Sequence, residues 1–388
     1  MRKLLFLCIF ILLTGCSASI KDISTKETFL SAVILSDLHY QEARDTENTY
    51  LPLTSRMPEL TETITQQVID IHPDVLIMTG DNTNNGKTEE VLQLKTYLQR
   101  IKDAGIQIVM ITGNHDMYGD QAFYRDSFFP LFEITGQDKE TMSYVSVIND
   151  VRIIAMDDSS ITQGKGGYFP KSTMKWLEKQ LKQANQEHQK ILFLSHYSIL
   201  TGLGTDDWDN YRIQNQELLP LLKKYHVRLA LTGHQHSQVL LQNENLYELI
   251  SATPTSFPCL FGKLSIEADE VSYHTETVDF KTYASEDFYQ DILSMQDSSS
   301  QRQTALFTQI LSEKIQDQEQ VSAALLLLNR FFSAFGSGNL GSVQKEIVND
   351  PSFNVLLEGL EDTNYGPWIK EMMKSDILNA GTFTFTYE

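Results

Sequence analysis

Several apolar runs in this chain end in residues that could bind a metal ion. The clearest case is TGNHDMYGD at residues 112–120, which follows the strand-like run IQIVMI and places Asn114, His115 and Asp116 in succession. A turn could use Gly113 and Asn114, because both residue types tolerate positive φ, but a turn has no need of the histidine and the aspartate that follow. This excess of polar groups after a buried strand predicts a ligand-binding site.

Four other apolar runs end in the same way, in SDLH, TGD, SHY and TGHQH. The acidic and imidazole residues in these endings are Asp37, His39, Asp81, His196, His234 and His236. In open α/β sheets the carboxyl ends of the strands line the crevice where ligands bind, so side chains far apart in the sequence can meet there. Any one of these histidines, taken alone, could equally be a hydrogen-bonded core or loop residue. Five strands that end alike favour a shared site.

The residue types in this set indicate metal ions. Burying several carboxylates and imidazoles together is costly unless a cation compensates them, and oxygen and nitrogen ligands without thiolate suit manganese, iron or zinc. Without His115 and Asp116 there are still seven candidate ligands, more than one tetrahedral ion takes, so we expect two divalent or mixed-valence ions, an arrangement that clamps a phosphoryl group and activates water. Gly80, Gly113 and Gly233 each precede a proposed ligand, where a missing side chain lets the backbone turn tightly.

The elements that must position these residues form two groups. Strand-like runs AVILS, DVLIM and IQIVMI alternate with helical patterns near 56–71 and 88–104, which favours βαβ units and a largely parallel sheet. Further strand-like runs after residue 143, with a hairpin at EADE, fit two sheets between helices better than one. From about residue 284 the strand signals stop, and helical patterns are separated by DSSSQ, GSGN and NDPS. We therefore expect a catalytic α/β domain over 28–283 and a smaller all-α helical domain over 284–388.

The ordered motifs DLH, GD, GNHD, a lone histidine and GHQH resemble those of the calcineurin-like metallophosphoesterases. The resemblance implies a four-layer αββα sandwich with two metal sites that share Asp81 as a bridging ligand. It assigns one ion to Asp37, His39 and His236, and the other to Asn114, His196 and His234. The wording of the motifs is most similar to the class III cyclic nucleotide phosphodiesterases, including lipid-anchored bacterial members with a helical C-terminal domain.

The resemblance implies hydrolysis of phosphodiester bonds, with cyclic nucleotides such as cAMP or cGMP as the expected substrates. We expect a hydroxide that bridges the two metal ions to attack phosphorus. His115 would protonate the departing alkoxide, and Asp116 would fix the tautomer of His115. Two alternatives stay open: a phosphomonoesterase, nucleotidase or nucleotide-sugar pyrophosphatase on the same fold, and a lipoprotein that binds a phosphate ligand without turnover. The second alternative predicts a broken ligand position, and the sequence has none.

The sequence gives weaker evidence for the residues that would bind the rest of the substrate. Trp208 and Tyr211, in the loop that follows His196, could stack on a nucleobase, and Asn215 could bond its edge. Asn84 and Asn85 could line the pocket after Asp81. The alternatives are aromatic residues that pack a surface loop or the helical domain, and asparagines that simply form a turn.

The N-terminal residues MRKLLFLCIFILLTGC combine a basic start with an apolar run too short to span a bilayer, as a secretory signal does. The ending LTGC resembles the lipobox of bacterial lipoproteins. This implies removal of signal residues 1–15, lipidation of Cys16, a tether at 16–27, and an extracytoplasmic protein anchored to the cell membrane. The alternative is an ordinary signal peptide with an incidental cysteine.

Cysteine content and charge narrow the remaining possibilities. If Cys8 leaves with the signal and Cys16 is lipidated, Cys259 is left alone, so we expect no intrachain disulfide. The formal net charge of −20 argues against binding to a nucleic-acid polymer. The expected partner is therefore a small-molecule phosphoester.

Overall fold

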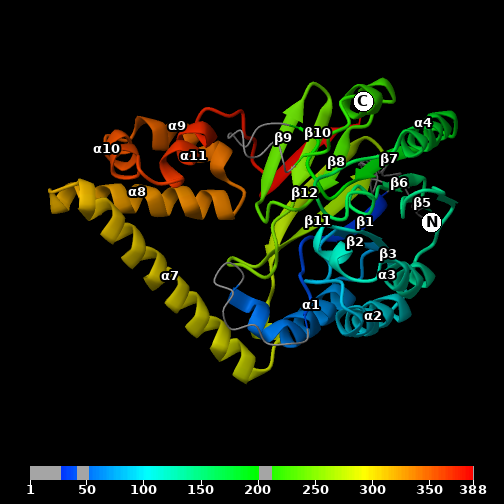
Figure 1. The fold of residues 1–388 in the computed structure, drawn as a ribbon, viewed down its shortest axis with the longest axis horizontal. Coiled ribbons are helices and arrows are strands. Elements are labelled where there is room, and N and C mark those ends of the chain that lie inside the picture. The colour runs from blue at the N-terminus through cyan, green and yellow to red at the C-terminus, as the bar shows by residue number, and fades with distance from the viewer. Residues whose placement is uncertain (1–27, 42–51, 201–211, 388) are drawn as a thin grey trace, which may run out of the picture.

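The computed structural model describes residues 28–41, 52–200 and 212–387. Two β-sheets pack face to face between helices (Figure 1), as the sequence predicted. The first sheet has the strand order β13-β12-β11-β1-β2-β3 and the second the order β4-β5-β6-β7-β8-β10-β9. The first sheet contains β1 (Thr28–Leu35), β2 (Val75–Thr79), β3 (Gln107–Ile111), β11 (Leu260–Glu267), β12 (Glu270–Thr277) and β13 (Thr382–Thr386). The second contains β4 (Gly136–Gln137), β5 (Tyr144–Ile148), β6 (Val151–Ala155), β7 (Lys190–Leu194), β8 (Leu229–Thr232), β9 (Val239–Asn243) and β10 (Leu246–Ile250).

The helices fall into those that flank the sheets and those of the C-terminal region. Flanking elements are α1 (Met57–Ile71), α2 (Thr88–Asp103), α3 (Gln121–Phe128), α4 (Lys171–Gln186), α5 (Leu218–Lys224) and the 3-10 helices η1 (Pro52–Arg56), η2 (His115–Tyr118) and η3 (Phe129–Leu131). The C-terminal helices are α6 (Phe280–Tyr283), α7 (Glu286–Lys314), α8 (Gln318–Gly336), α9 (Leu340–Asn349), α10 (Ser352–Gly359) and α11 (Tyr365–Met372).

Parallel pairing aligns the strand ends from which the functional side chains come. Strands β1, β2 and β3 pair in parallel in the first sheet, and β6, β7, β8 and β10 do so in the second. Every residue of β2 and β8 is buried, which explains why these strands read as continuous apolar runs rather than alternating ones.

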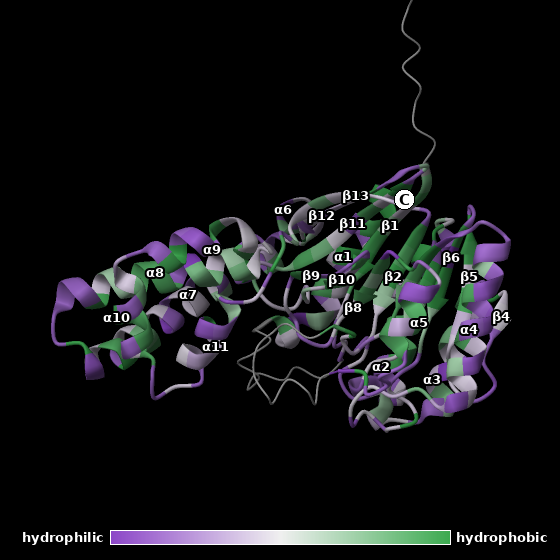
Figure 2. Ribbon diagram, turned by 90° about the horizontal axis from the view of Figure 1, so that it is seen from above, coloured by the Kyte–Doolittle hydropathy of each residue, from purple (hydrophilic) through white to green (hydrophobic). Residues whose placement is uncertain are grey.

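Hydrophobic contact between the two sheets forms the main core. One cluster of buried side chains contains residues from both sheets, such as Val33 and Ile77 from the first and Ile153 and Leu231 from the second. Figure 2 shows hydrophobic residues along the central strands and hydrophilic residues on the outer faces of the helices. A second cluster joins α4, α5 and the second sheet to the C-terminal helices.

The helical region differs from the prediction at DSSSQ, which the sequence analysis took as a separator between two helices. In the structure α7 runs through this segment without a break (Figure 1). Its ends are anchored in different cores: Phe288 and Ile292 belong to the first cluster, and Phe307 and Leu311 to the second. Serine costs a helix only about 0.5 kcal/mol per residue relative to alanine, so packing at both ends outweighs the local preference.

Contrary to the sequence prediction, the segment from 284 onward is not entirely helical, because it ends in the strand β13. This strand pairs antiparallel with β12 and returns the chain to the first sheet. Phe383 stacks on Tyr273 with ring centroids 5.0 Å apart, and Phe385 pairs opposite Val271. The alternation in TFTFT is the signal that could have revealed it. The domain boundary at 283/284 stays a prediction.

The expectation that the apolar stretch in α8 is a core helix fits its burial, with Leu328 and Phe331 fully enclosed. Among the described residues, no helix combines the length and apolarity needed to cross a bilayer.

Candidate metal centre

The seven predicted ligands lie together beyond the carboxyl ends of five strands. Ligand atoms of Asp37, His39, Asp81 and His236 lie within 4.8 Å of one another, and so do those of Asp81, His196 and His234. Asp81 belongs to both groups. This is the grouping that the family resemblance implied.

The Asp81 carboxylate lies between the two groups. One oxygen, Oδ2, is 3.7 Å from His39 Nε2 and 3.5 Å from His196 Nε2. In the first group His39 Nε2 is 2.9 Å from His236 Nε2, which is 3.5 Å from Asp37 Oδ1. These ring nitrogens and carboxylate oxygens therefore point at common centres rather than into the surrounding protein.

Asn114 lies beside the second group. The side-chain oxygen of Asn114 is 3.1 Å from His196 Nε2, and His234 Nδ1 is 3.2 Å from the same nitrogen. The other nitrogen of His196, Nδ1, lies 2.9 Å from the carbonyl oxygen of Thr79. A carbonyl can only accept, so Nδ1 carries a proton and Nε2 is the nitrogen that faces the cluster.

This donor set fits two metal ions. Ligand atoms bound at right angles to one ion, each at roughly 2.1 Å, lie about 3 Å apart, which matches the spacing of the facing ring nitrogens and the amide oxygen. Such atoms would otherwise repel one another, and a cation between them relieves the repulsion. Nitrogen and oxygen donors suit manganese, iron and zinc alike, so they do not fix which ion binds.

The protonation states also suit metal binding. Burial alone would raise the pKa of Asp37, but the neighbouring imidazole of His236 outweighs it, and the pKa is lowered. Burial is likewise outweighed at Asp81, where His196 and His39 hold the pKa well below its usual range. Burial lowers the pKa of His39 to about 4 and that of His234 to about 3. Ionised carboxylates and neutral imidazoles are the forms in which these side chains bind metals.

His196 is the exception in the metal-free protein. Burial opposes its protonation, but the Asp81 carboxylate prevails and raises the pKa to about 10. A metal ion that binds Nε2 of His196 must therefore displace a proton, so the affinity for metal decreases as the pH is lowered.

Backbone strain is concentrated at the ligands. Five of them adopt the left-handed conformation, with φ between 48° and 67°: Asp37, His39, Asp81, His234 and His236. Each such residue costs on the order of 1 to 3 kcal/mol, and strain of this kind persists where the surrounding structure enforces a functional geometry.

The glycines beside the ligands provide the space that the sequence analysis expected. A Cβ at Gly80 would meet the ring of His196, and one at Gly113 would meet Asp81. At Gly233 it would meet Asp37 and Ser36. These three positions therefore exclude any larger residue unless a ligand moves.

His115 lies beside the first group. Its ring packs edge-on against His39, with centroids 4.5 Å apart, and its backbone N–H donates to Asp81 Oδ1 at 2.8 Å. Its Nδ1 is 2.8 Å from the carbonyl oxygen of Asn84, which fixes the proton on Nδ1. Nε2 is then the ring nitrogen available to a substrate.

The predicted role of Asp116 is wrong, because its carboxylate accepts hydrogen bonds from Asn82, Thr83 and Gly113 and the Nδ1 of His115 bonds to Asn84. Oδ2 accepts from the Gly113 N–H at 2.9 Å and from the backbone and side chain of Asn82 at 3.2 and 3.0 Å. Oδ1 accepts from the backbone and hydroxyl of Thr83 at 2.8 and 2.7 Å. Asp116 thus ties the loop after β2 to the loop after β3, and the Asn84 carbonyl orients His115 in its place.

Two further buried carboxylates, which no sequence motif marked, hold the metal-binding loops. Asp158 accepts the backbone N–H groups of His196 and Tyr197 at 3.0 and 2.9 Å. Glu248 accepts those of Ile199 and Leu200 at 2.9 and 2.6 Å. The signal for Glu248 was a single charge inside the apolar strand LYELI.

The predicted substrate-binding residues are not brought together in the described part of the chain. The backbone and side-chain amides of Asn85 donate to Glu90 at the start of α2, at 2.8 and 3.1 Å. Asn215 is buried, and both ends of its amide bond to the backbone of Phe169. Asn84 donates to Gln41 at 2.9 Å and contributes its carbonyl to His115. Trp208, Tyr211 and Cys16 lie outside the described residues.

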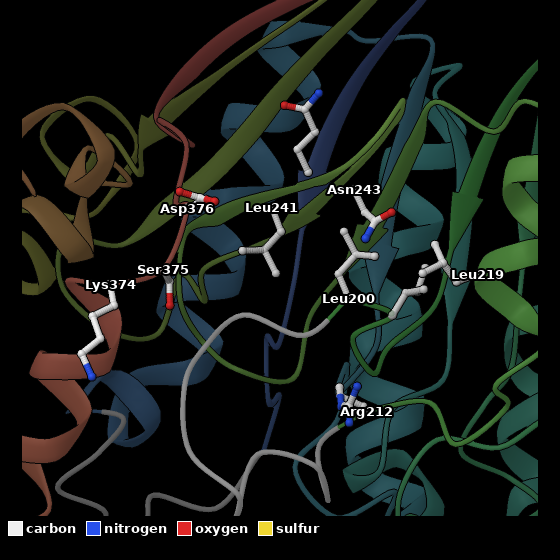
Figure 3. A pocket seen from close by; sticks show the side chains of 10 residues that line it. Leu200, Arg212, Leu219, Leu241, Asn243, Lys374, Ser375 and Asp376 are labelled. Carbon is white, nitrogen blue, oxygen red and sulfur yellow. The ribbon is translucent and has the colours of Figure 1, made fainter.

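A cavity of about 460 Å³ lies next to the segment that follows His196. Figure 3 shows its lining residues, which come from β9, from positions such as Leu200 and Arg212, and from the segment Lys374 to Asp376 after α11. The nearby Ser198 hydroxyl accepts a hydrogen bond from Gln235, the residue between His234 and His236, at 2.8 Å. The C-terminal region therefore contributes to a hollow that adjoins the metal-binding loops.

The family model for calcineurin-like phosphoesterases matches residues 30–238, which is more than half of the chain. The chain belongs to this family. The resemblance found in the sequence is thus confirmed, and the matched range contains all seven metal ligands.

Similar proteins include two kinds of phosphodiesterase. The chain is 32% identical over 186 residues to the probable glycerophosphodiester phosphodiesterase GpdQ of Arcobacter nitrofigilis, which covers 47% of this chain and 64% of that protein. It is 25% identical over 220 residues to a 3',5'-cyclic-nucleotide phosphodiesterase of Nostoc sp., covering 56% and 73%. The chain thus spans slightly less than two thirds of the length of the Arcobacter protein.

A solved structure supports the fold alone. A dimetal phosphatase from Danio rerio superimposes with a TM-score of 0.52 at 15% identity, covering 65% of this chain and 97% of that protein.

Proposed function

We propose that this protein is a metal-dependent phosphodiesterase that hydrolyses small phosphodiesters. The observation that supports it most directly is the pair of ligand groups that share Asp81. Two bound divalent ions would neutralise phosphoryl charge and lower the pKa of water, which is the chemistry that a phosphodiester needs. Such a centre also reconciles an anionic substrate with the acidic chain, because surface charges are screened beyond about 8 Å at physiological salt.

In this proposal the chain's own residues position the substrate and the proton. His115 is held by the Asn84 carbonyl through Nδ1–H, so its imidazolium form can donate the proton on Nε2 to the departing alkoxide and become the neutral Nδ1–H tautomer. The backbone N–H of His115 donates a hydrogen bond to Asp81, which holds His115 at a fixed position relative to the ligand that both metal groups share.

We propose cyclic nucleotides as the first substrate class, on the wording of the motifs and the similarity to the Nostoc phosphodiesterase. Glycerophosphodiesters are the second candidate, because the Arcobacter relative named for them has the higher identity over its matched region. The panel that tests this uses manganese-loaded protein with cyclic AMP, glycerophosphocholine, a 5'-nucleotide and UDP-glucose. Turnover of either diester above the other two substrates supports the proposal. Binding of phosphate without turnover of any member would favour the non-enzymatic alternative.

The acid role of His115 has its own test. His115→Ala should slow diesters with poor alcohol leaving groups by roughly 100-fold or more, and p-nitrophenyl diesters much less, because nitrophenolate needs little protonation. His274→Ala, at an exposed position on β12, is the matched control and should leave both rates unchanged. Equal losses on both substrates would remove the acid role.

We also propose that the protein is an extracytoplasmic lipoprotein anchored through Cys16, as its N-terminal sequence suggests. Full-length protein should partition with the membrane fraction and incorporate labelled fatty acid, and Cys16→Ala should abolish the label. Unchanged labelling in the variant would contradict the anchor.

A further inference from the structure

Tyr118 is a large aromatic residue that is left open to solvent beside the metal centre. It ends η2, which begins at His115, and its side chain is 60% exposed. Its ring packs on His115 with centroids 5.3 Å apart at an interplanar angle of 59°. His115 in turn packs edge-on against His39 of the first metal group. The exposed ring of Tyr118 thus lies at the rim of the centre.

Tyr197 packs against the second metal group. Its ring is 4.4 Å from that of His234, and its hydroxyl donates to the Gly164 carbonyl at 3.1 Å. Tyr118 lies on the side of the first metal group, through its contact with His115, and Tyr197 lies on the side of the second.

The backbone that presents Tyr118 is held firmly. A Cβ at Gly86 would meet the Asp116 carbonyl, and a Cβ at Gly119 would meet the Gly86 carbonyl, so η2 and the loop after β2 are in direct contact. The Asp116 carboxylate fixes the same two segments to each other. A ring on such a support loses little conformational freedom when a ligand covers it.

Single exposed apolar residues are common and usually need no explanation. Among the described residues, the other large aromatic with comparable exposure is Tyr365 in α11, at 38%. Its ring packs edge-on against Phe307 in the helical region. Tyr118 differs from Tyr365 because, within the described residues, the one aromatic ring that it contacts is that of His115, the predicted general acid.

We propose that Tyr118 is a specificity-determining residue that stacks on a flat ring of the substrate, such as a nucleobase. This inference rests on the proposed function and narrows it toward nucleotide diesters. Stacking of one base on an aromatic side chain strengthens binding by roughly 5- to 100-fold. A glycerol substituent has no ring face and gains nothing comparable.

The test compares Tyr118→Leu, which removes the ring, with Tyr118→Phe, which keeps it. Calorimetric titration of manganese-loaded protein with AMP and with ribose 5-phosphate separates the base from the sugar phosphate. Tyr118→Leu should raise the Kd for AMP about 10-fold and leave that for ribose 5-phosphate unchanged. Tyr118→Phe and the control Tyr365→Leu should bind both ligands as the wild type does.

Three results would overturn the inference: equal weakening of both ligands in Tyr118→Leu, no weakening of either, or wild-type protein that binds AMP no tighter than ribose 5-phosphate. Its failure is distinguishable from that of the proposed function. If the wild type cleaves no phosphodiester but Tyr118→Leu still loses AMP selectively, the activity is wrong and the stacking role stands. If diesters are cleaved and the variant binds AMP normally, only the stacking role is wrong.

Discussion

Replacing Asp116 with asparagine tests whether this carboxylate holds the loops together or orients His115. The side chain is fully buried and accepts from the backbone N–H groups of Asn82, Thr83 and Gly113. Those three donors lie in the loops that contain Asp81 and Asn114. Asp116→Asn changes one oxygen to an NH₂ group and leaves the volume nearly the same.

The expected cost follows from counting the donors that lose an acceptor. If the amide oxygen of the new asparagine takes the place of Oδ2, its NH₂ group faces the N–H of Thr83, which loses its acceptor. If the oxygen takes the place of Oδ1, the N–H groups of Asn82 and Gly113 lose theirs. Each buried N–H without an acceptor costs about 1 to 3 kcal/mol. The amide will take the orientation that leaves only the Thr83 N–H unpaired, so we expect Asp116→Asn to lower the free energy of unfolding by about 1 to 3 kcal/mol. A domain is typically stable by about 5 to 15 kcal/mol, so the variant should still fold.

The assay is urea unfolding of metal-free protein at pH 8, followed by circular dichroism, with a manganese titration of the folded variant. Burial and the charge of Asp81 raise the pKa of Asp116 to about 6, so the wild-type carboxyl is ionised at this pH. The matched control is Asp120→Asn, at the exposed N-cap of α3. A single oxygen of Asp120 accepts from Ala122 and Phe123, and an amide oxygen caps equally well, so its change should stay under about 0.5 kcal/mol.

One result would refute the role of Asp116 in holding the loops together. Asp116→Asn with wild-type stability and manganese affinity, but with selective loss of turnover for poor leaving groups, would return Asp116 to the role of orienting His115. It would mean that the hydrogen bonds to Asn82, Thr83 and Gly113 contribute little.

Two further predictions concern the loops and their support. Burial raises the pKa of Glu248 from 4.5 to about 7. The folded state therefore binds this proton more tightly than the unfolded state, and the stabilisation that the proton provides is lost as the pH rises through 7. Between pH 5 and 8 the unfolding free energy of the wild type should fall by about 2 kcal/mol relative to Glu248→Gln, and parallel profiles would contradict this. Gly80→Ala places a methyl group against the His196 ring and should weaken manganese binding at least 10-fold. Gly105→Ala shares the positive φ but meets no neighbour, so it should cost stability while manganese affinity is retained; equal affinity in both variants would show that the ring of His196 tolerates the contact.

The parts of the fold that the sequence predicted are those with a strong local signal. Long apolar runs such as those at β2 and β8 are buried on every residue, and each is followed two residues later by a proposed metal ligand, Asp81 or His234. The grouping of Asp37 with His236, far apart in the chain, required the additional premise that strand ends converge. The family resemblance supplied the grouping, and the geometry agrees with it.

The parts that the sequence did not reveal depend on tertiary contacts. The serines within α7 favour a break locally, and only the two cores at the helix ends keep it continuous. The short strand β13 is stabilised by β12, on the far side of the helical region in the sequence. The direction of the Asp116 side chain depends on where the backbone of Thr83 lies, which no spacing rule within GNHD contains.

The most direct test of the metal centre is an anomalous difference map from a crystal grown with manganese. We expect two peaks about 3.5 to 4 Å apart, both within bonding distance of the Asp81 carboxylate, with Asn114 and His196 beside one and His39 and His236 beside the other. A single peak, or peaks away from Asp81, would contradict the two-metal account.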